Sequence, residues 1–235
     1  MNYKDSISLF RTQIDIEQFN RKAPVMVMTD KQVMVYLSMI QNQLQRNYLL
    51  YEKSVDITLK AGICVYDVGT NAYNIPSDIY RIKNVSIPNQ YPDLIGISKD
   101  QMLASEKELV ITKYCYYGTN ENAKLEINAK PLYDYGINYP NSKLVLKYYP
   151  AFSLFDSKAG TTNATFPIPN GTLPNEWSEA VQDGEWLLPP EWHDLIISGG
   201  VALIFKDLKK EWIMECERMT KDDKIDLSLT YKIGI

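Results

Sequence analysis

Residues 188–205 read LPPEWHDLIISGGVALIF, a run that is apolar on nearly every side of the helix it would form. A helix at the surface of a globular protein keeps a polar face toward water, so a helix without one needs neighbours on every side. The longest apolar stretch, residues 195–205, is too short to cross a bilayer, which takes roughly 20 residues. The run therefore predicts a helix that is buried inside protein.

A glycine pair lies in the middle of this helix. Gly199 and Gly200 each lower helix stability by about 1 kcal/mol relative to alanine. Close approach of a neighbouring backbone is the usual compensation for such a cost. Pro190 suits the first helical turn, and the amphipathic pattern after residue 205 predicts one continuous long helix over residues 189–220.

The N-terminal part of the chain contains a second strong helix signal. Thr29 and Gln32 have the spacing of a capping box, in which each side chain bonds the backbone of the other residue. A long helix is predicted over residues 29–50, with an apolar stripe and a glutamine-rich outer face that includes Gln41 and Gln45. Residues 15–19 are only weakly helical in pattern, and Pro24 follows them.

Residues 55–149 change to the period of β-strands. Residues 56–60 and 64–68 alternate and predict a pair of strands, and residues 109–117 and 123–129 flank a polar loop and predict a hairpin. Strands and helices do not alternate regularly, so no parallel sheet is expected. The expected fold is α+β in a single domain over residues 1–235: a helical core of two long helices, a small antiparallel β portion and a long extended interaction arm.

The expected arm comprises residues 151–188. This segment is much longer than a usual connection, and it has too many apolar groups for a free linker. We expect it to dock on a neighbouring surface, with Trp177 and Trp186 as its anchors.

Bulk composition excludes several functions. The net charge of −4 argues against a protein that grips phosphate backbones, because that affinity comes from clustered Lys and Arg. The three cysteines lack metal-ligand spacing, so no zinc site or disulfide framework is predicted. No glycine-rich phosphate loop is present, so no nucleotide cofactor is expected. No basic and apolar secretion signal opens the sequence, which predicts assembly in a cytoplasm.

One group of residues has catalytic residue types. Glu191, His193 and Asp194 bring the only histidine close in sequence to two carboxylates, which general acid–base chemistry could use. Adjacent positions on a helix do not face each other, and acidic residues in a first turn complement the helix dipole. We therefore favour a structural role for the histidine and assign neither a catalytic nor a metal site.

The order of the motifs carries more information than any one of them. YLSMIQNQLQR precedes DITLKAG-x-x-x-Y and IPSDIYRIKNV, and LVLKYYP precedes LPPEWHDLIISGGVALIF. This succession, over about residues 29–219, resembles the head-to-tail connectors of short-tailed bacteriophages, the adaptor proteins beneath the portal. In that family a Tyr-x-x-Pro-x-Asp turn and a Leu-Pro-x-x-x-His start of a C-terminal helix recur in this order. The bias toward Ile, Asn, Lys and Tyr resembles that of crAss-like phages, and the long arm departs from the family pattern.

The resemblance implies a structural virion protein at the neck between capsid and tail. Its copies would form a ring, a dodecamer in the family, that binds the portal protein and further neck or tail proteins, and through which DNA passes without sequence-specific binding. No membrane is implied. The expected subunit or partner interface residues are the arm tryptophans together with Trp192, Gly199, Gly200 and Trp212, and the apolar helix would then pack on an adjacent subunit.

Two other functions compete with this interpretation. A carbohydrate-binding or tail surface-binding module could use the abundant tyrosine and tryptophan rings as stacking platforms. A hydrolase could use Glu191, His193 or acidic residues of the arm, and its turnover would be lost on substitution of His193 by alanine.

Overall fold

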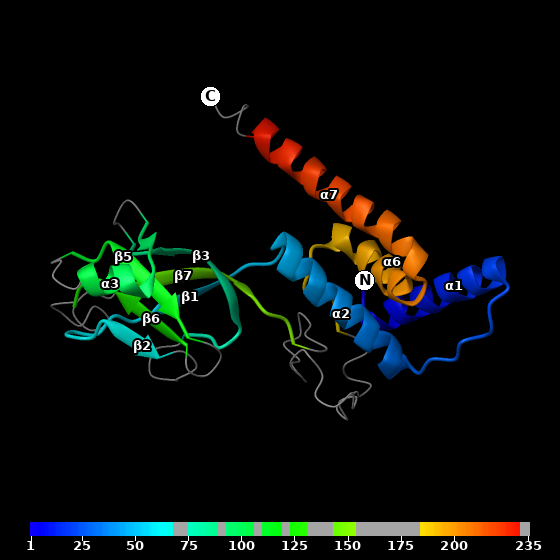
Figure 1. Cartoon of the computed structure of the whole chain (residues 1–235), viewed down its shortest axis with the longest axis horizontal. Helices are drawn as coiled ribbons and strands as arrows, with labels where there is room; N and C mark the ends of the chain where they lie inside the picture. Colours follow the sequence, from blue (N-terminus) through cyan, green and yellow to red (C-terminus); the bar gives the residue numbers. More distant parts are fainter. Residues whose placement is uncertain are drawn as a thin grey trace. The chain divides into compact units, whose positions relative to one another are not determined.

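The computed structural model describes residues 1–67, 75–88, 93–105, 110–118, 123–130, 143–153 and 184–230 (Figure 1). The chain forms two compact units. Unit 1 comprises Met1–Tyr51 and Phe152–Ile235 and is helical in its described part, whereas unit 2 is Glu52–Ala151 and contains the strands. The expected mixed α+β class is confirmed.

Unit 1 begins with a helix that the sequence signalled only in part. α1 (Tyr3–Arg21) starts at Asn2, whose side chain accepts a hydrogen bond from the Asp5 backbone N–H. One face is buried at helical spacing and consists of Tyr3, Ile7, Phe10 and Ile14. Because most of the remaining positions are polar or charged, the apolar stripe is narrow, and tertiary packing provides most of the stability of such a helix.

α2 (Asp30–Tyr48) begins at the predicted capping box, which is formed in full by Thr29 and Gln32. The prediction of a glutamine-rich outer face is wrong, because Gln41 and Gln45 are fully buried. Gln41 Oε1 accepts a hydrogen bond from the Leu187 backbone N–H (2.8 Å), and Gln45 bonds both backbone groups of Tyr51. These amides satisfy buried backbone groups that would otherwise cost about 1–3 kcal/mol each.

The single C-terminal helix predicted over residues 189–220 is also wrong. A short 3-10 turn, η3 (Pro190–Trp192), leads into α6 (His193–Ile204), and the chain then leaves helical geometry at Phe205 (φ −100°, ψ 86°). A second 3-10 turn, η4 (Lys206–Leu208), precedes α7 (Lys209–Thr230). The break lies where the all-round apolar pattern changes to an amphipathic one, so α6 can be buried while α7 keeps a solvent face.

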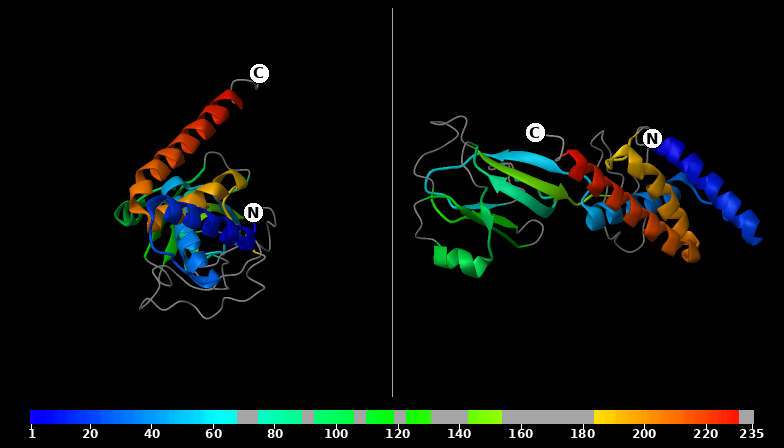
Figure 2. Two further views of the ribbon diagram at one scale, coloured as in Figure 1. Left: turned by 90° about the vertical axis from the view of Figure 1, so that its right-hand side faces the viewer. Right: turned by 90° about the horizontal axis from the view of Figure 1, so that it is seen from above.

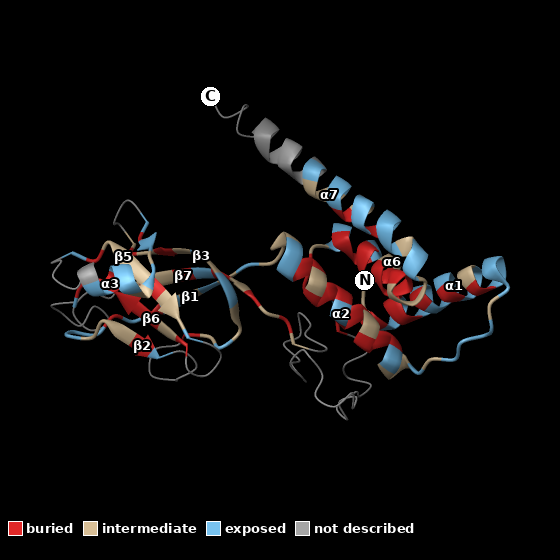
Figure 3. Ribbon diagram, in the orientation of Figure 1, coloured by how far each residue is buried: buried red, intermediate tan, exposed pale blue. Residues whose placement is uncertain are grey.

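α6 is the central helix of unit 1. It packs against α1, α2 and α7, and it lies between α1 and α7 when seen from above (Figure 2, right). Buried positions cover nearly all of α6, whereas α1 and residues 209–221 of α7 combine buried and exposed positions (Figure 3). The need for neighbours on every side is therefore met by helices of the same chain.

Unit 2 contains two small sheets. The first has the order β1-β7-β3, formed by Lys53–Ile57, Leu144–Pro150 and Ile79–Ser86, with antiparallel pairing throughout. The second has the order β2-β6-β5-β4, formed by Val65–Asp67, Lys124–Ile127, Lys113–Tyr117 and Ile95–Gly96. The predicted hairpin is confirmed as β5 and β6.

Two details of the β portion differ from expectation. Residues 56–60 and 64–68 do not pair with each other, because β1 pairs with β7 and β2 pairs with β6. The short edge strand β4 is parallel to β5, so the portion is not wholly antiparallel. α3 (Lys99–Ser105) follows β4 directly and packs against β5.

α3 also contributes to a polar cluster on the second sheet. The buried Glu126 carboxylate of β6 forms an ion pair with the Lys99 ammonium, which also donates a hydrogen bond to the Tyr117 hydroxyl (3.3 Å). The hydrogen bond from Lys99 to Glu126 raises the pKa of Lys99. The ion pair therefore contributes its full stabilisation to unit 2 at pH values below the ordinary lysine pKa. This contribution is lost as the pH rises through the raised pKa that Lys99 has in the folded state.

We expect Lys99→Met to lower the free energy of unfolding of unit 2 by about 1–3 kcal/mol at neutral pH, because Glu126 would keep a buried charge without its cation. The rate of hydrogen exchange at the backbone amides of β5 and β6 measures this change in the free energy of unfolding. Lys124→Met is the matched control, since Lys124 pairs with the half-exposed Asp67 and exposed pairs contribute about 0–1 kcal/mol. Equal effects of the two substitutions would contradict the assignment.

Candidate assembly surface

The structure places most of the predicted interface residues inside unit 1. Trp186 and Trp192 are almost completely buried, and Trp212 is 7% exposed. The Trp212 indole N–H donates to the Leu195 carbonyl (2.9 Å), which joins α7 to α6. These three indole side chains are core residues of the chain itself. Their burial within unit 1 accounts for the large aromatic side chains without a subunit interface. Trp177 lies outside the described residues.

The glycine pair is explained in the same way. A Cβ on Gly199 would lie 2.7 Å from Trp212 Cε2, and a Cβ on Gly200 would lie 2.7 Å from Leu37 Cδ2. α6 therefore approaches α7 at one glycine and α2 at the other. The expected packing of these glycines on an adjacent subunit is replaced by packing within the chain.

His193 has a structural environment. Its ring is buried, and Nε2 bonds the Leu188 carbonyl (2.9 Å) while Nδ1 lies 3.3 Å from the amino group of Met1. Glu191 and Asp194 are exposed. The imidazole and the two carboxylates thus lie in different environments and do not form an acid–base group.

The described residues contain no cluster of three or more His, Cys, Asp or Glu side chains that could hold a metal ion. Burial raises the pKa of Cys216 to about 11, so its thiol stays protonated near neutral pH and is a poor nucleophile. Within the part of the chain that the structure describes, no helix has both the length and the apolar character to cross a membrane.

A groove opens on one flank of α1. It has a volume of about 460 Å³ and lies between α1, α6 and the start of α7. Its apolar lining is Ile16, Val201, Leu208 and Trp212, and its acidic lining is Glu17, Glu211 and Glu215. Glu17 is paired with Arg21 and Glu215 with Arg218. Glu211 has no basic partner among the described residues.

The α1–α2 connection lies on the other flank of α1 (Figure 1). Val25, Met26 and Val27 are 81%, 45% and 90% exposed, although all three are apolar. We name residues 25–27 the apolar tip. Single exposed apolar residues are common on protein surfaces, whereas contiguous exposed apolar residues favour an interaction with another surface.

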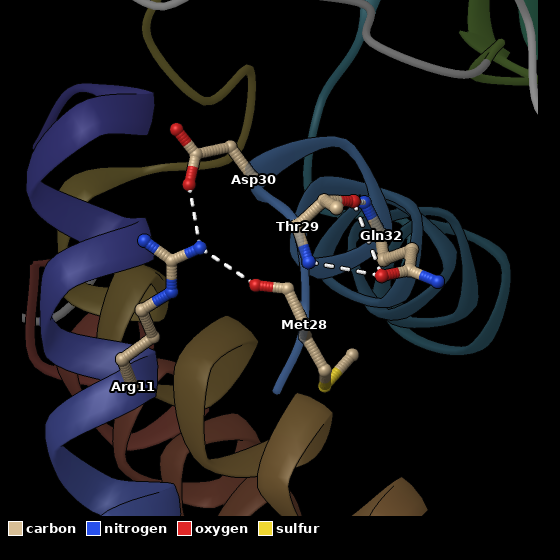
Figure 4. Close-up of polar contacts among 5 residues, drawn as sticks. All are labelled: Arg11, Met28, Thr29, Asp30 and Gln32. Atoms are coloured by element: carbon tan, nitrogen blue, oxygen red, sulfur yellow. Dashed lines mark hydrogen bonds and ion pairs between the residues drawn. The ribbon is translucent and has the colours of Figure 1, made fainter. Parts of the chain in front are cut away.

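Both ends of the apolar tip are fixed. Before it, Lys22 closes α1 in the left-handed conformation (φ 51°), and the Ala23 N–H donates to the Gln18 carbonyl (2.9 Å). After it, Arg11 donates to the Met28 carbonyl (2.7 Å) and pairs with Asp30 (2.6 Å), next to the capping box of α2 (Figure 4). The tip is therefore presented between anchored ends.

Sequence reasoning did not find this surface. The sequence pattern predicted no element at Val25 to Met28, although four apolar residues after a proline are unusual in a connection between helices. The groove could not be found from sequence, because its lining comes from residues 13–17 and 198–215, which only the folded chain brings together. Leu9, Ile16 and Phe19 add exposed apolar area along α1.

Neither a protein-family model nor a curated protein matches the chain.

Proposed function

We propose that the chain is a structural virion protein whose copies assemble into a ring-shaped connector between the portal and the tail of a short-tailed bacteriophage. The proposal takes its biological setting from the order of the sequence motifs. The observation that carries the assembly part is the pair of unlike apolar surfaces on opposite flanks of α1. Two unlike surfaces on one subunit favour head-to-tail association, which closes into a ring when the rotation between subunits permits it.

The burial of three of the four tryptophans supports this function over a carbohydrate-binding module that stacks sugars on tryptophan. A sugar-binding platform needs exposed rings, whereas Trp186, Trp192 and Trp212 are buried in unit 1. The environment of His193 likewise gives the hydrolase alternative no support. The exposed apolar residues of unit 1 are mostly aliphatic, which suits contact with another protein.

Native mass spectrometry of the purified chain, with electron microscopy of the same sample, tests the proposal. We expect closed rings, and a dodecamer would match the family that the sequence resembles. Two results together would contradict the proposal: the chain stays monomeric at high concentration, and it is not captured when it is mixed with capsid–portal assemblies. Tryptophan fluorescence that responds to glycans would instead support the carbohydrate-binding alternative.

A further inference from the structure

We infer that the apolar tip of one copy of this chain binds in the acidic-lined groove of the next copy. This inference rests on the proposed function, because it names the contact that would join neighbouring subunits. The occupant of the groove is a second copy of this chain, which contributes its apolar tip, residues 25–27, and Lys22 shortly before it.

The apolar tip and the groove match in size and polarity. Three extended residues span about 10 Å. The groove wall from Leu208 to Glu215 has a similar length, since seven residues at about 1.5 Å each rise about 10 Å. The tip offers two β-branched side chains, Val25 and Val27, and the groove offers an apolar floor to receive them.

The two surfaces also carry opposite charges. Lys22, three residues before the apolar tip, is exposed, and it has no acidic partner among the described residues. Glu211 is exposed on the groove wall and is likewise without a basic partner in the described part of the chain. Contact between copies would pair the two charges at the edge of an apolar contact, which is where charged groups usually lie in interfaces.

The groove and the apolar tip lie on different flanks of α1. With 3.6 residues per turn, the groove residues Gln13 and Glu17 project from one flank of α1. Arg11, which bonds the Met28 carbonyl just after the apolar tip, projects from the other flank. The buried face of α1 lies between these flanks. A chain therefore cannot place its own tip in its own groove while Arg11 holds Met28, so the contact has to be made between copies.

Cysteine cross-linking tests the contact directly. In a Cys64→Ser background, Val27→Cys is combined with Glu211→Cys, and the full chain is treated at high concentration with a short bis-maleimide. We expect covalent dimers and higher multimers at least tenfold more abundant than in the matched control, Val27→Cys with Glu217→Cys. Glu217 is also exposed on α7 but does not line the groove. Equal yields, or no multimers, would overturn the inference.

The result separates the inference from the proposed function. Native mass spectrometry could show that the cross-linked multimers are open oligomers or dimers. That result would support the contact between copies and contradict the closed ring. Rings without the specific cross-link would support the proposed function and overturn the contact. The absence of both would overturn both.

A charge exchange provides an independent measurement. Lys22→Glu and Glu211→Lys should each lower the association constant of the full chain about tenfold in sedimentation analysis, and the two together in one chain should restore it. Val27→Asp should lower it by tenfold or more, because the groove would have to desolvate a carboxylate. Val110→Asp replaces another exposed valine, in unit 2, which is 60% exposed against 90% for Val27, and should leave association unchanged. If the double exchange fails to restore association, Lys22 and Glu211 do not meet.

Discussion

Gly199→Leu is expected to lower the free energy of unfolding of unit 1 by about 3 kcal/mol or more. Even the first side-chain atom would lie 2.7 Å from Trp212 Cε2 and 2.8 Å from Ile40 Cγ2, so α6 and α7 would have to separate. Leucine favours helix over glycine by about 1 kcal/mol, which offsets only part of this cost. The substitution would therefore reduce ring formation because unit 1 unfolds, rather than because a subunit contact is blocked.

Urea denaturation followed by tryptophan fluorescence measures this effect on unit 1, because none of the four tryptophans lies in residues 52–151. Ser198→Leu is the matched control: it adds the same side chain at the preceding position, which is only half-buried. We expect the control to change stability by less than about 1 kcal/mol. If Gly199→Leu were no worse than Ser198→Leu, the close packing of α6 on α7 would be wrong.

Trp186→Ala should cost about 3–5 kcal/mol of stability in unit 1. The ring is fully buried, its centroid lies 4.5 Å from that of Tyr3, and its indole N–H donates to the Ser6 hydroxyl (2.8 Å). The substitution leaves a cavity and removes a buried hydrogen bond at the same time. Helical circular dichroism during urea denaturation is the appropriate measurement, because the variant also loses a fluorophore.

Two further variants separate the causes at this position. Trp186→Phe keeps most of the apolar volume and removes the N–H donor, so we expect a smaller loss of about 1–2 kcal/mol. Glu185→Ala changes the exposed neighbour and should leave stability nearly unchanged. A stable Trp186→Ala monomer that no longer assembles would show that the indole side chain belongs to a subunit interface, as the sequence first suggested.

Features that depend on neighbours along the chain could be predicted from the amino-acid sequence. The capping box at Thr29 and Gln32, the β5–β6 hairpin and the need to bury α6 on every side all appear in the structure. Each is set by propensities and side-chain spacing within a few residues, and such local effects are the ones that a sequence pattern records.

Contacts between residues far apart in the chain could not be predicted, because they depend on the tertiary packing. α1 was underestimated because its apolar stripe is narrow, and its stability comes from packing on α6. Gln41 and Gln45 are polar in any pattern, yet they are buried because the backbone of Leu187 and Tyr51 needs their amides. The partners of Gly199 and Gly200 lie in α1, α2 and α7 rather than in another subunit. The groove and the apolar tip follow from the same cause, since contacts between distant segments decide which apolar residues are covered and which remain exposed.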